Sequence, residues 1–161
     1  MAALRLTAMI CALHEAGVEF LVVGGLSAVL NGVPVNTFDL DVVHRGTPEN
    51  VDRIMPVLEA LDAVYRIQPQ RRLRPAKEAL MSADHQNLLT KYGPLDLLGM
   101  IGHDLGYEEL VPRSTEMLIA EGVRVRILNL ETLIEVKEQL GGEKDRAMLP
   151  LLRRALQEHR R

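Results

Sequence analysis

Three aspartates lie in segments that are otherwise apolar. Asp39 and Asp41 stand one residue apart in FDLDVV, and Asp96 lies in PLDLL. A lone carboxylate in a buried strand costs on the order of several kcal/mol unless it is paired or neutralised. If the two segments lie side by side, all three side chains can converge on one hard cation, and ligation by oxygen alone suits Mg²⁺ or Mn²⁺.

A glycine pair upstream could bind phosphate. Gly24 and Gly25 lie between an apolar strand and a short helix, where backbone amides can approach phosphate oxygens and the helix amino end favours negative charge. Ser27 adds a hydroxyl donor in the first turn. Because Mg²⁺ is usually held by one or two carboxylates together with substrate phosphates, we expect a nucleoside triphosphate as the missing ligand. Neither GxGxxG nor GxxxxGK occurs, which excludes the dinucleotide-binding and P-loop motifs.

Strands must present these carboxylates. Residues 20–23 predict a short buried strand, and residues 38–43 predict the next one. Since strand side chains alternate, both aspartates of this second strand should lie on one face and Phe38 on the other. Residues 87–91 and 95–98 predict two consecutive strands joined by a glycine-proline turn.

Helices and further strands complete the pattern. Thr47 and Pro48 form a helix start, with a hydroxyl cap and proline at the first helical position. Asn129 can cap another helix, which Gly141 ends. Helices are predicted over residues 2–16, 26–30, 48–61, 130–140 and 143–158, and further strands over residues 63–67, 115–120 and 123–128. No layout is predicted for residues 68–85.

This order predicts an α+β (α/β) fold. We expect a mixed β-sheet with helices packed against it, ending in a carboxyl-terminal helix pair. A chain of 161 residues has the size of one domain, so residues 1–161 are expected to form a single unit. Its core should cover about residues 18–128 and its terminal helices about residues 129–158.

Composition narrows the classes of function. The formal net charge of −3 gives no global basic field for nucleic acid, and 3% aromatic residues disfavour a base-stacking platform. One basic cluster, Arg71, Arg72, Arg74 and Lys77, fits either a solvated loop or a local RNA or phosphate contact. A single cysteine, Cys11, no leader-peptide pattern and no apolar run of bilayer length predict a cytoplasmic protein without disulfides or membrane contact.

The glycine and aspartate motifs together resemble the signature of the DNA polymerase beta-like nucleotidyltransferases. That signature is a hydrophobic residue, Gly, then Gly or Ser, a spacer, Asp-x-Asp or Asp-x-Glu, and a later acid within a strand. The chain has Val23-Gly24-Gly25, thirteen residues, Asp39-Leu40-Asp41, and then Leu95-Asp96-Leu97.

This resemblance implies a nucleotidyltransferase fold and an enzyme that uses two divalent ions. Asp39 and Asp41 would ligate both ions, and Asp96 would complete one site and orient or deprotonate the attacking hydroxyl. A nucleoside monophosphate would pass from a nucleoside triphosphate to a hydroxyl of RNA, protein or a small molecule, with release of pyrophosphate.

Within that superfamily the chain is most similar to the small bacterial nucleotidyltransferases of toxin-antitoxin and abortive-infection systems. These often carry a threonine two residues before the first aspartate, matched by Thr37, and a lysine followed by Lys-Asp, matched by Lys137 and Lys144-Asp145. The resemblance implies that Thr37 belongs to the nucleotide site and that Lys137 and Lys144 neutralise the triphosphate. Both lysines also fit solvated helix faces. A cognate toxin or antitoxin is an implied partner.

Two departures from the family pattern leave other functions open. Val35 stands where an arginine is often found near Pro34, and Met148 or Leu149 stands where a second acid is expected after Lys-Asp. One alternative is a catalytically inactive nucleotidyltransferase fold that acts as the binding partner in a toxin-antitoxin pair. Another is a small-molecule nucleotidyltransferase of the antibiotic-modifying kind.

Overall fold

One mixed sheet forms the centre of the protein. A computed structural model of the chain describes residues 2–161, with side chains from Arg5 onward. The strands are β1 (Phe20–Val23), β2 (Leu40–His44), β3 (Val64–Tyr65), β4 (His85–Thr90), β5 (Gly93–Leu98), β6 (Ser114–Ala120) and β7 (Val123–Leu128). They pair in the order β3-β4-β5-β2-β1-β7-β6. The β2–β5 and β1–β7 pairs are parallel and the other pairs are antiparallel.

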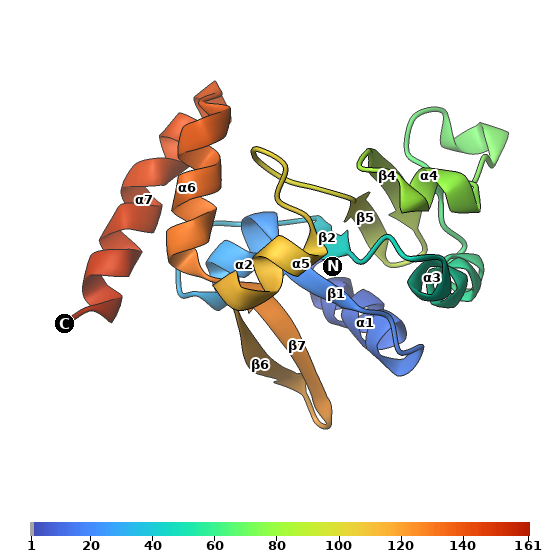
Figure 1. Cartoon of the computed structure of the whole chain (residues 1–161), viewed down its shortest axis with the longest axis horizontal. Helices are drawn as coiled ribbons and strands as arrows, with labels where there is room; N and C mark the ends of the chain where they lie inside the picture. Colours follow the sequence, from blue (N-terminus) through green and yellow to red (C-terminus); the bar gives the residue numbers. More distant parts are fainter. Residues whose placement is uncertain (1) are drawn as a thin grey trace.

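Helices cover both faces of this sheet (Figure 1). The α-helices are α1 (Ala2–Glu15), α2 (Gly24–Leu30), α3 (Pro48–Ala60), α4 (Lys77–Met81), α5 (Tyr107–Leu110), α6 (Leu130–Leu140) and α7 (Glu143–His159), with 3-10 turns η1 (Pro69–Arg71) and η2 (Val111–Arg113). One apolar cluster contains residues of α1, α3 and α4, and a second contains residues of α2, α6 and α7. The sheet therefore separates two cores.

Strand alternation assigns each side chain to one of these cores. In β1, Val22 belongs to the first cluster, while Leu21 and Val23 belong to the second. In β2, Val42 belongs to the first cluster and Val43 to the second. Asp41 alternates with Val42, so its side chain lies on the face that α2, α6 and α7 cover.

The fold class, the terminal helix pair and the β6–β7 hairpin confirm the sequence predictions. Thr47 caps α3 by accepting a hydrogen bond from the backbone N–H of Asn50 at 3.3 Å. No helix within residues 2–161 is both long and apolar enough to cross a membrane.

Three local predictions were wrong. The strand predicted over residues 38–43 begins at Leu40, so Phe38 lies before the strand and is 63% exposed. The strand predicted over residues 63–67 is only Val64–Tyr65. Gly24 and Gly25 begin α2 and do not form a separate turn before it.

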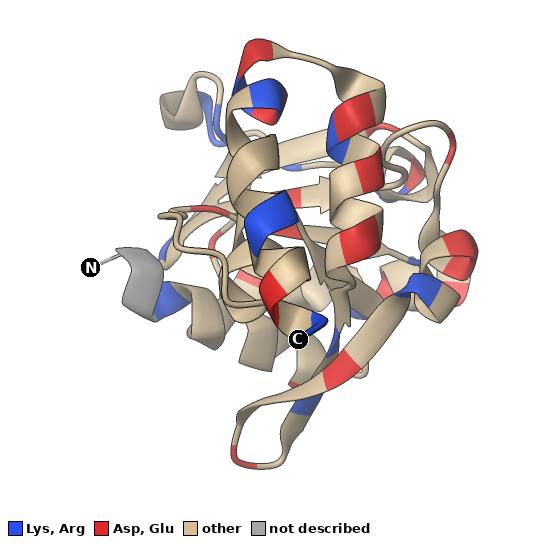
Figure 2. Cartoon of the chain, turned by 90° about the vertical axis from the view of Figure 1, so that its left-hand side faces the viewer, with Lys and Arg blue, Asp and Glu red and all other residues tan. Residues whose placement is uncertain are grey.

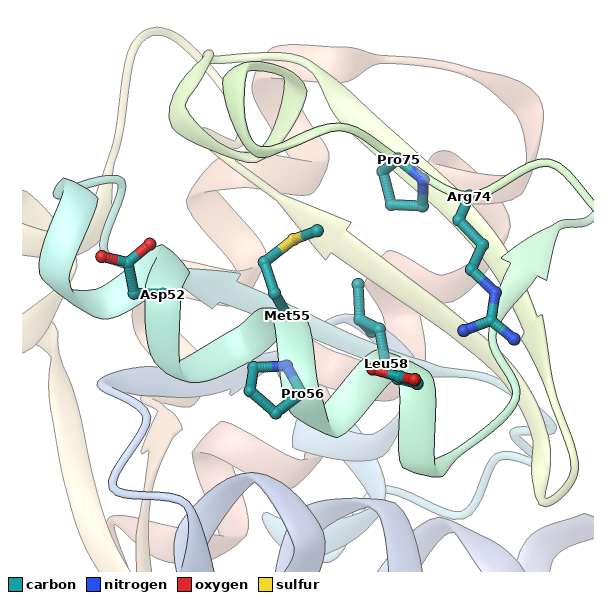
Figure 3. A pocket seen from close by; sticks show the side chains of 7 residues that line it. Asp52, Met55, Pro56, Leu58, Arg74 and Pro75 are labelled. Carbon is teal, nitrogen blue, oxygen red and sulfur yellow. The ribbon is translucent and has the colours of Figure 1, made fainter.

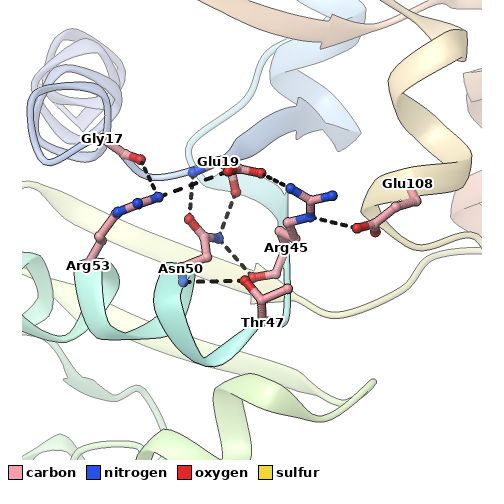
Figure 4. Close-up of polar contacts among 7 residues, drawn as sticks. All are labelled: Gly17, Glu19, Arg45, Thr47, Asn50, Arg53 and Glu108. Atoms are coloured by element: carbon pink, nitrogen blue, oxygen red, sulfur yellow. Dashed lines mark hydrogen bonds and ion pairs between the residues drawn. The ribbon is translucent and has the colours of Figure 1, made fainter.

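A polar network fixes how β1 pairs with β2 (Figure 4). The buried Asn50 side chain accepts from the Glu19 N–H at 2.7 Å and donates to the carbonyls of Glu19 and Arg45 at 3.0 and 2.8 Å. The Arg45 side chain pairs with Glu19 and Glu108, each at 2.6 Å. These contacts lie just beyond the Phe20–His44 end of the ladder, so they hold the register that places Val23 opposite Asp41.

We expect Asn50→Ala to lower the free energy of unfolding by about 2 to 4 kcal/mol, because the part-buried N–H of Glu19 and carbonyl of Arg45 lose their hydrogen bonds to the Asn50 side chain. Urea denaturation followed by circular dichroism measures this change. The exposed Asn36→Ala is the control and should change it by less than about 0.5 kcal/mol. Equal stability of the two variants would contradict this role of Asn50.

Candidate functional site

Two neighbouring strands place Asp41 beside Asp96. The strands β2 and β5 are parallel, and their register pairs these two aspartates directly. Side chains of paired residues point to the same face, so both carboxylates emerge together on the α2, α6 and α7 side. Asp39 lies in the segment just before β2. One carboxylate oxygen from each of Asp39, Asp41 and Asp96 lies within 4.8 Å of the other two.

This proximity raises the pKa of Asp41. Burial is the main cause, followed by a hydrogen bond to Asp96 and by the charges of Asp96 and Asp39, while the Lys137 charge acts in the opposite direction; the pKa rises from 3.8 to about 8. Without a bound cation, Asp41 is therefore largely protonated at neutral pH. A site that stores this much carboxylate repulsion favours a divalent cation, and its oxygen donors suit Mg²⁺ or Mn²⁺.

The glycine pair makes room for the acids. A Cβ on Gly24 would fall on Oδ2 of Asp41, and Gly24 has a φ of +65°, where side chains are strained. A Cβ on Gly25 would lie 2.8 Å from Oγ1 of Thr37. Both glycines thus allow the start of α2 to pack directly against the segment that carries the aspartates.

The two hydroxyl residues take different places. Thr37 lies beside Gly25, and its Oγ1 donates to the backbone carbonyl of Asp39 at 3.3 Å, which orders the approach to β2. Ser27 is fully buried, and its Oγ donates to the carbonyl of Gly24 at 2.6 Å. The Ser27 hydroxyl therefore forms a hydrogen bond inside α2.

A hollow of about 270 Å³ opens next to the acids. Asp41, Gly24 and Lys137 line it, together with apolar side chains that include Met100 and Ile101. Its walls come from the β1–α2 junction, from residues 98–102 and from α6. The hollow joins a carboxylate cluster, a cation and an apolar wall in one space.

An acid holds Lys137 in place. The Nζ of Lys137 lies 3.0 Å from Oδ1 of Asp145, and Oδ2 of Asp145 accepts from the backbone N–H of Gly142 at the start of α7. Lys144 is exposed on α7 and does not line the hollow. The two predicted phosphate-binding lysines therefore differ, and only Lys137 faces the acids.

Sequence reasoning missed Arg66. The Nη2 of Arg66 lies 2.6 Å from Oδ1 of Asp96, and this arginine comes directly after β3. A partner for Asp96 was expected, but its identity depends on β3, β4 and β5 being neighbours, which no local pattern reveals. His85, which also lines the hollow, was missed for the same reason.

The apolar side chains of Val35, Met148 and Leu149 contribute to the second core. Val35 and Met148 pack against the second core, and Leu149 is a buried member of it. These positions join α7 and the segment after α2 to the sheet by apolar contacts. A charged side chain at Leu149 would have to be buried there.

A second hollow, of about 330 Å³, lies between α3 and the segment before α4 (Figure 3). Its polar side chains include Asp52 and Arg74, which pair with Lys77 and Asp62 respectively. The carboxylates of Asp39, Asp41 and Asp96 lie elsewhere, so the larger volume of this hollow does not make it the better candidate for chemistry.

We expect Mn²⁺ binding to become tighter with rising pH up to about 8, because a protonated Asp41 cannot ligate a metal. Calorimetry in buffers of different ionisation enthalpy should detect about one proton released per ion at pH 6.5 and about half a proton at pH 8. The matched variant Asp41→Asn should release none. If the wild-type chain binds Mn²⁺ without releasing a proton at any pH, Asp41 is not a protonated ligand of this site.

The raised pKa of Asp41 also makes the stability of the metal-free protein depend on pH. Between about pH 4 and pH 8 the folded chain keeps a proton on Asp41 that the unfolded chain has lost. This group therefore makes the free energy of unfolding of the metal-free protein fall as pH rises through that window.

No family model and no curated protein matches the chain. Among solved structures, the chain is similar to a Thermotoga maritima protein described as a "putative nucleotidyltransferase". The identity is 20% over 95% of this chain and 91% of that chain, with a TM-score of 0.58. A likeness at this identity shows the fold and leaves the function to the site. The chain thus has a nucleotidyltransferase-like α+β fold, and the neighbour carries no evidence for the toxin-antitoxin type.

Proposed function

We propose that this chain is a metal-dependent nucleotidyltransferase. It would transfer a nucleoside monophosphate from a nucleoside triphosphate to a hydroxyl and release pyrophosphate. The observation that carries the proposal is the convergence of three aspartate oxygens within 4.8 Å, next to a hollow that also contains Lys137. The nucleotidyltransferase-like fold supports it, since Asp41 and Asp96 lie on paired strands of that fold and Asp39 directly precedes one of them.

Asp39, Asp41 and Asp96 would hold Mg²⁺ or Mn²⁺. When bound, such ions polarise the phosphate and stabilise the charge that develops during its transfer. The three carboxylates supply oxygen donors and more negative charge than a buried site tolerates alone, which gives binding its driving force. Gly24 keeps the space beside Asp41 free of side-chain atoms.

The hollow fits part of a nucleotide. Its volume of about 270 Å³ is at the low end for small-molecule sites, which commonly measure about 300 to 1,000 Å³. The apolar wall would contact the base and ribose, while the triphosphate would lie between Lys137, the backbone at Gly24 and Gly25, and the acids. Thr37 would support the segment that carries Asp39.

The transfer balances as a single displacement. The acceptor oxygen bonds to the α-phosphorus as the bond from that phosphorus to the bridging oxygen of pyrophosphate breaks. The acceptor proton would pass to a carboxylate, and we assign this role to Asp96. The charge of Lys137 would offset the negative charge gained by the departing pyrophosphate.

The acceptor would be recognised locally. Figure 2 shows that α6 and α7 carry both acidic and basic residues, and the chain as a whole has a net charge of −3. Of the predicted basic cluster, Arg72 and Arg74 pair with Asp62 and Lys77 pairs with Asp52. An RNA, protein or small-molecule acceptor would therefore be bound by its reacting end and not by an extended basic surface.

A second candidate function is that of an inactive binding partner in a toxin-antitoxin pair. It is favoured by Val35, which stands where an arginine is often found, and by Met148 or Leu149, which stands where a second acid is expected. An inactive partner would bind its cognate protein even when the aspartates are replaced.

The test is transfer of labelled nucleotide from ATP, CTP, GTP and UTP, with Mg²⁺, to RNA, protein and amino-sugar acceptors. The double variant Asp39→Asn, Asp41→Asn should lose at least about 100-fold in rate. Asp52→Asn, the same change at an exposed position of α3, should retain full rate. No metal-dependent labelling of any acceptor, or equal labelling by the double variant, would refute the enzyme and leave the binding partner.

Lys137→Met should raise the KM for the triphosphate by about 10-fold to 100-fold, because a charged contact to phosphate is worth about 1.5 to 3 kcal/mol. Steady-state kinetics with varied triphosphate measures this effect. Lys144→Met should change KM much less, since Lys144 is exposed and outside the hollow. Equal effects of the two changes would refute the assignment of Lys137.

A further inference from the structure

Asp96 has a cation of its own. The Nη2 of Arg66 lies 2.6 Å from Oδ1 of Asp96 and also donates to the carbonyl of Leu88 at 3.1 Å. The side chains are 34% and 13% exposed. Apart from the Lys137–Asp145 pair, the acid of every other described ion pair is at least 37% exposed. This ion pair is therefore shielded from water to a degree unusual in this chain.

The backbone also holds Arg66 in register with Asp96. The N–H of Arg66 donates to the carbonyl of Asn87 at 3.0 Å, and Asn87 on β4 is the direct partner of Asp96 on β5. Arg66, Asn87 and Asp96 thus form a row across neighbouring strands. The guanidinium reaches the carboxylate from a fixed starting point, not from a mobile loop.

Part of the guanidinium is buried without a partner. The Nε of Arg66 has no hydrogen-bond partner among the described residues, although it is shielded from solvent. Leaving a buried donor unpaired costs free energy, and such exceptions call for an explanation. The ion pair with Asp96 explains this unpaired donor, because it draws the guanidinium into a position where Nε is buried.

We infer that Arg66 is a positioning residue that orients Asp96 for the cation site. This inference rests on the proposed function, since it assumes that the three aspartates bind a divalent ion. Arg66 engages Oδ1 of Asp96 and limits rotation of the carboxylate, so that the group is held toward Asp41 and Asp39. Partners that hold a metal ligand in this way typically contribute about 10-fold to 100-fold to metal affinity or activity.

Two effects of Arg66 on a metal ion oppose each other. Its positive charge repels the ion, so removing that charge alone would tighten binding. Its hydrogen bond orients Asp96, so losing that bond would weaken binding. Because the two effects have opposite signs, one affinity measurement decides between them.

The experiment is a titration with Mn²⁺, followed by electron paramagnetic resonance of the free ion, on the full chain. Arg66→Met should bind Mn²⁺ about 10-fold to 100-fold more weakly than wild type. Arg66→Lys can still donate one hydrogen bond to Asp96 but lacks the planar fork of donors, so its affinity should fall in between. Arg74→Met, which removes an arginine from an exposed pair with Asp62, should stay within about twofold.

The outcomes separate this inference from the function it rests on. If wild type binds Mn²⁺ and Arg66→Met binds it equally or more tightly, the positioning role alone is overturned. If Asp41→Asn binds Mn²⁺ with the same affinity as wild type, the metal site is overturned and the inference with it. If Arg66→Met does not fold by circular dichroism, Arg66→Lys decides, and its equal affinity would overturn the role. If wild type and the variants bind Mn²⁺ as expected but wild type transfers no nucleotide, only the proposed function is refuted.

Discussion

Asp41 and Asp96 face each other on neighbouring parallel strands, and much of the surrounding structure accommodates these two carboxylates. The β2–β5 register sets Asp41 against Asp96, and Asp39 joins them from the preceding segment. The protein relieves the charge in two ways, by raising the pKa of Asp41 and by pairing Asp96 with Arg66. A bound divalent cation would relieve the remaining negative charge, and the cluster therefore supports the proposal of metal binding.

The rest of the fold positions this cluster from several directions. The Asn50 network fixes the far end of β1 and β2, and so places Val23 opposite Asp41. Immediately after Val23, Gly24 lets α2 begin against the Asp41 carboxylate. The α6–α7 pair then closes the same face and presents Lys137, which Asp145 holds. Stability and chemistry thus depend on the same registers.

The sequence predicted the parts of this arrangement that depend on local patterns. Helix signals such as Thr47 at the start of α3 and Gly141 after α6 act within a few residues, and the structure confirms them. The approach of Asp96 to the other aspartates was predicted only on condition that the two strands are neighbours, and the structure meets that condition. Arg66 could not be predicted, because its contact depends on the order of three strands. Phe38 was placed inside the strand because alternation cannot tell where a strand begins.

We propose that Asp39, Asp41 and Asp96 form one cation site in front of a nucleotide. Anomalous diffraction from a crystal soaked with Mn²⁺ and a non-hydrolysable nucleoside triphosphate tests it most directly. We expect an anomalous peak within about 2.3 Å of an oxygen of each aspartate, with the phosphates facing Lys137. A peak elsewhere, or aspartates too far apart to share an ion, would contradict it.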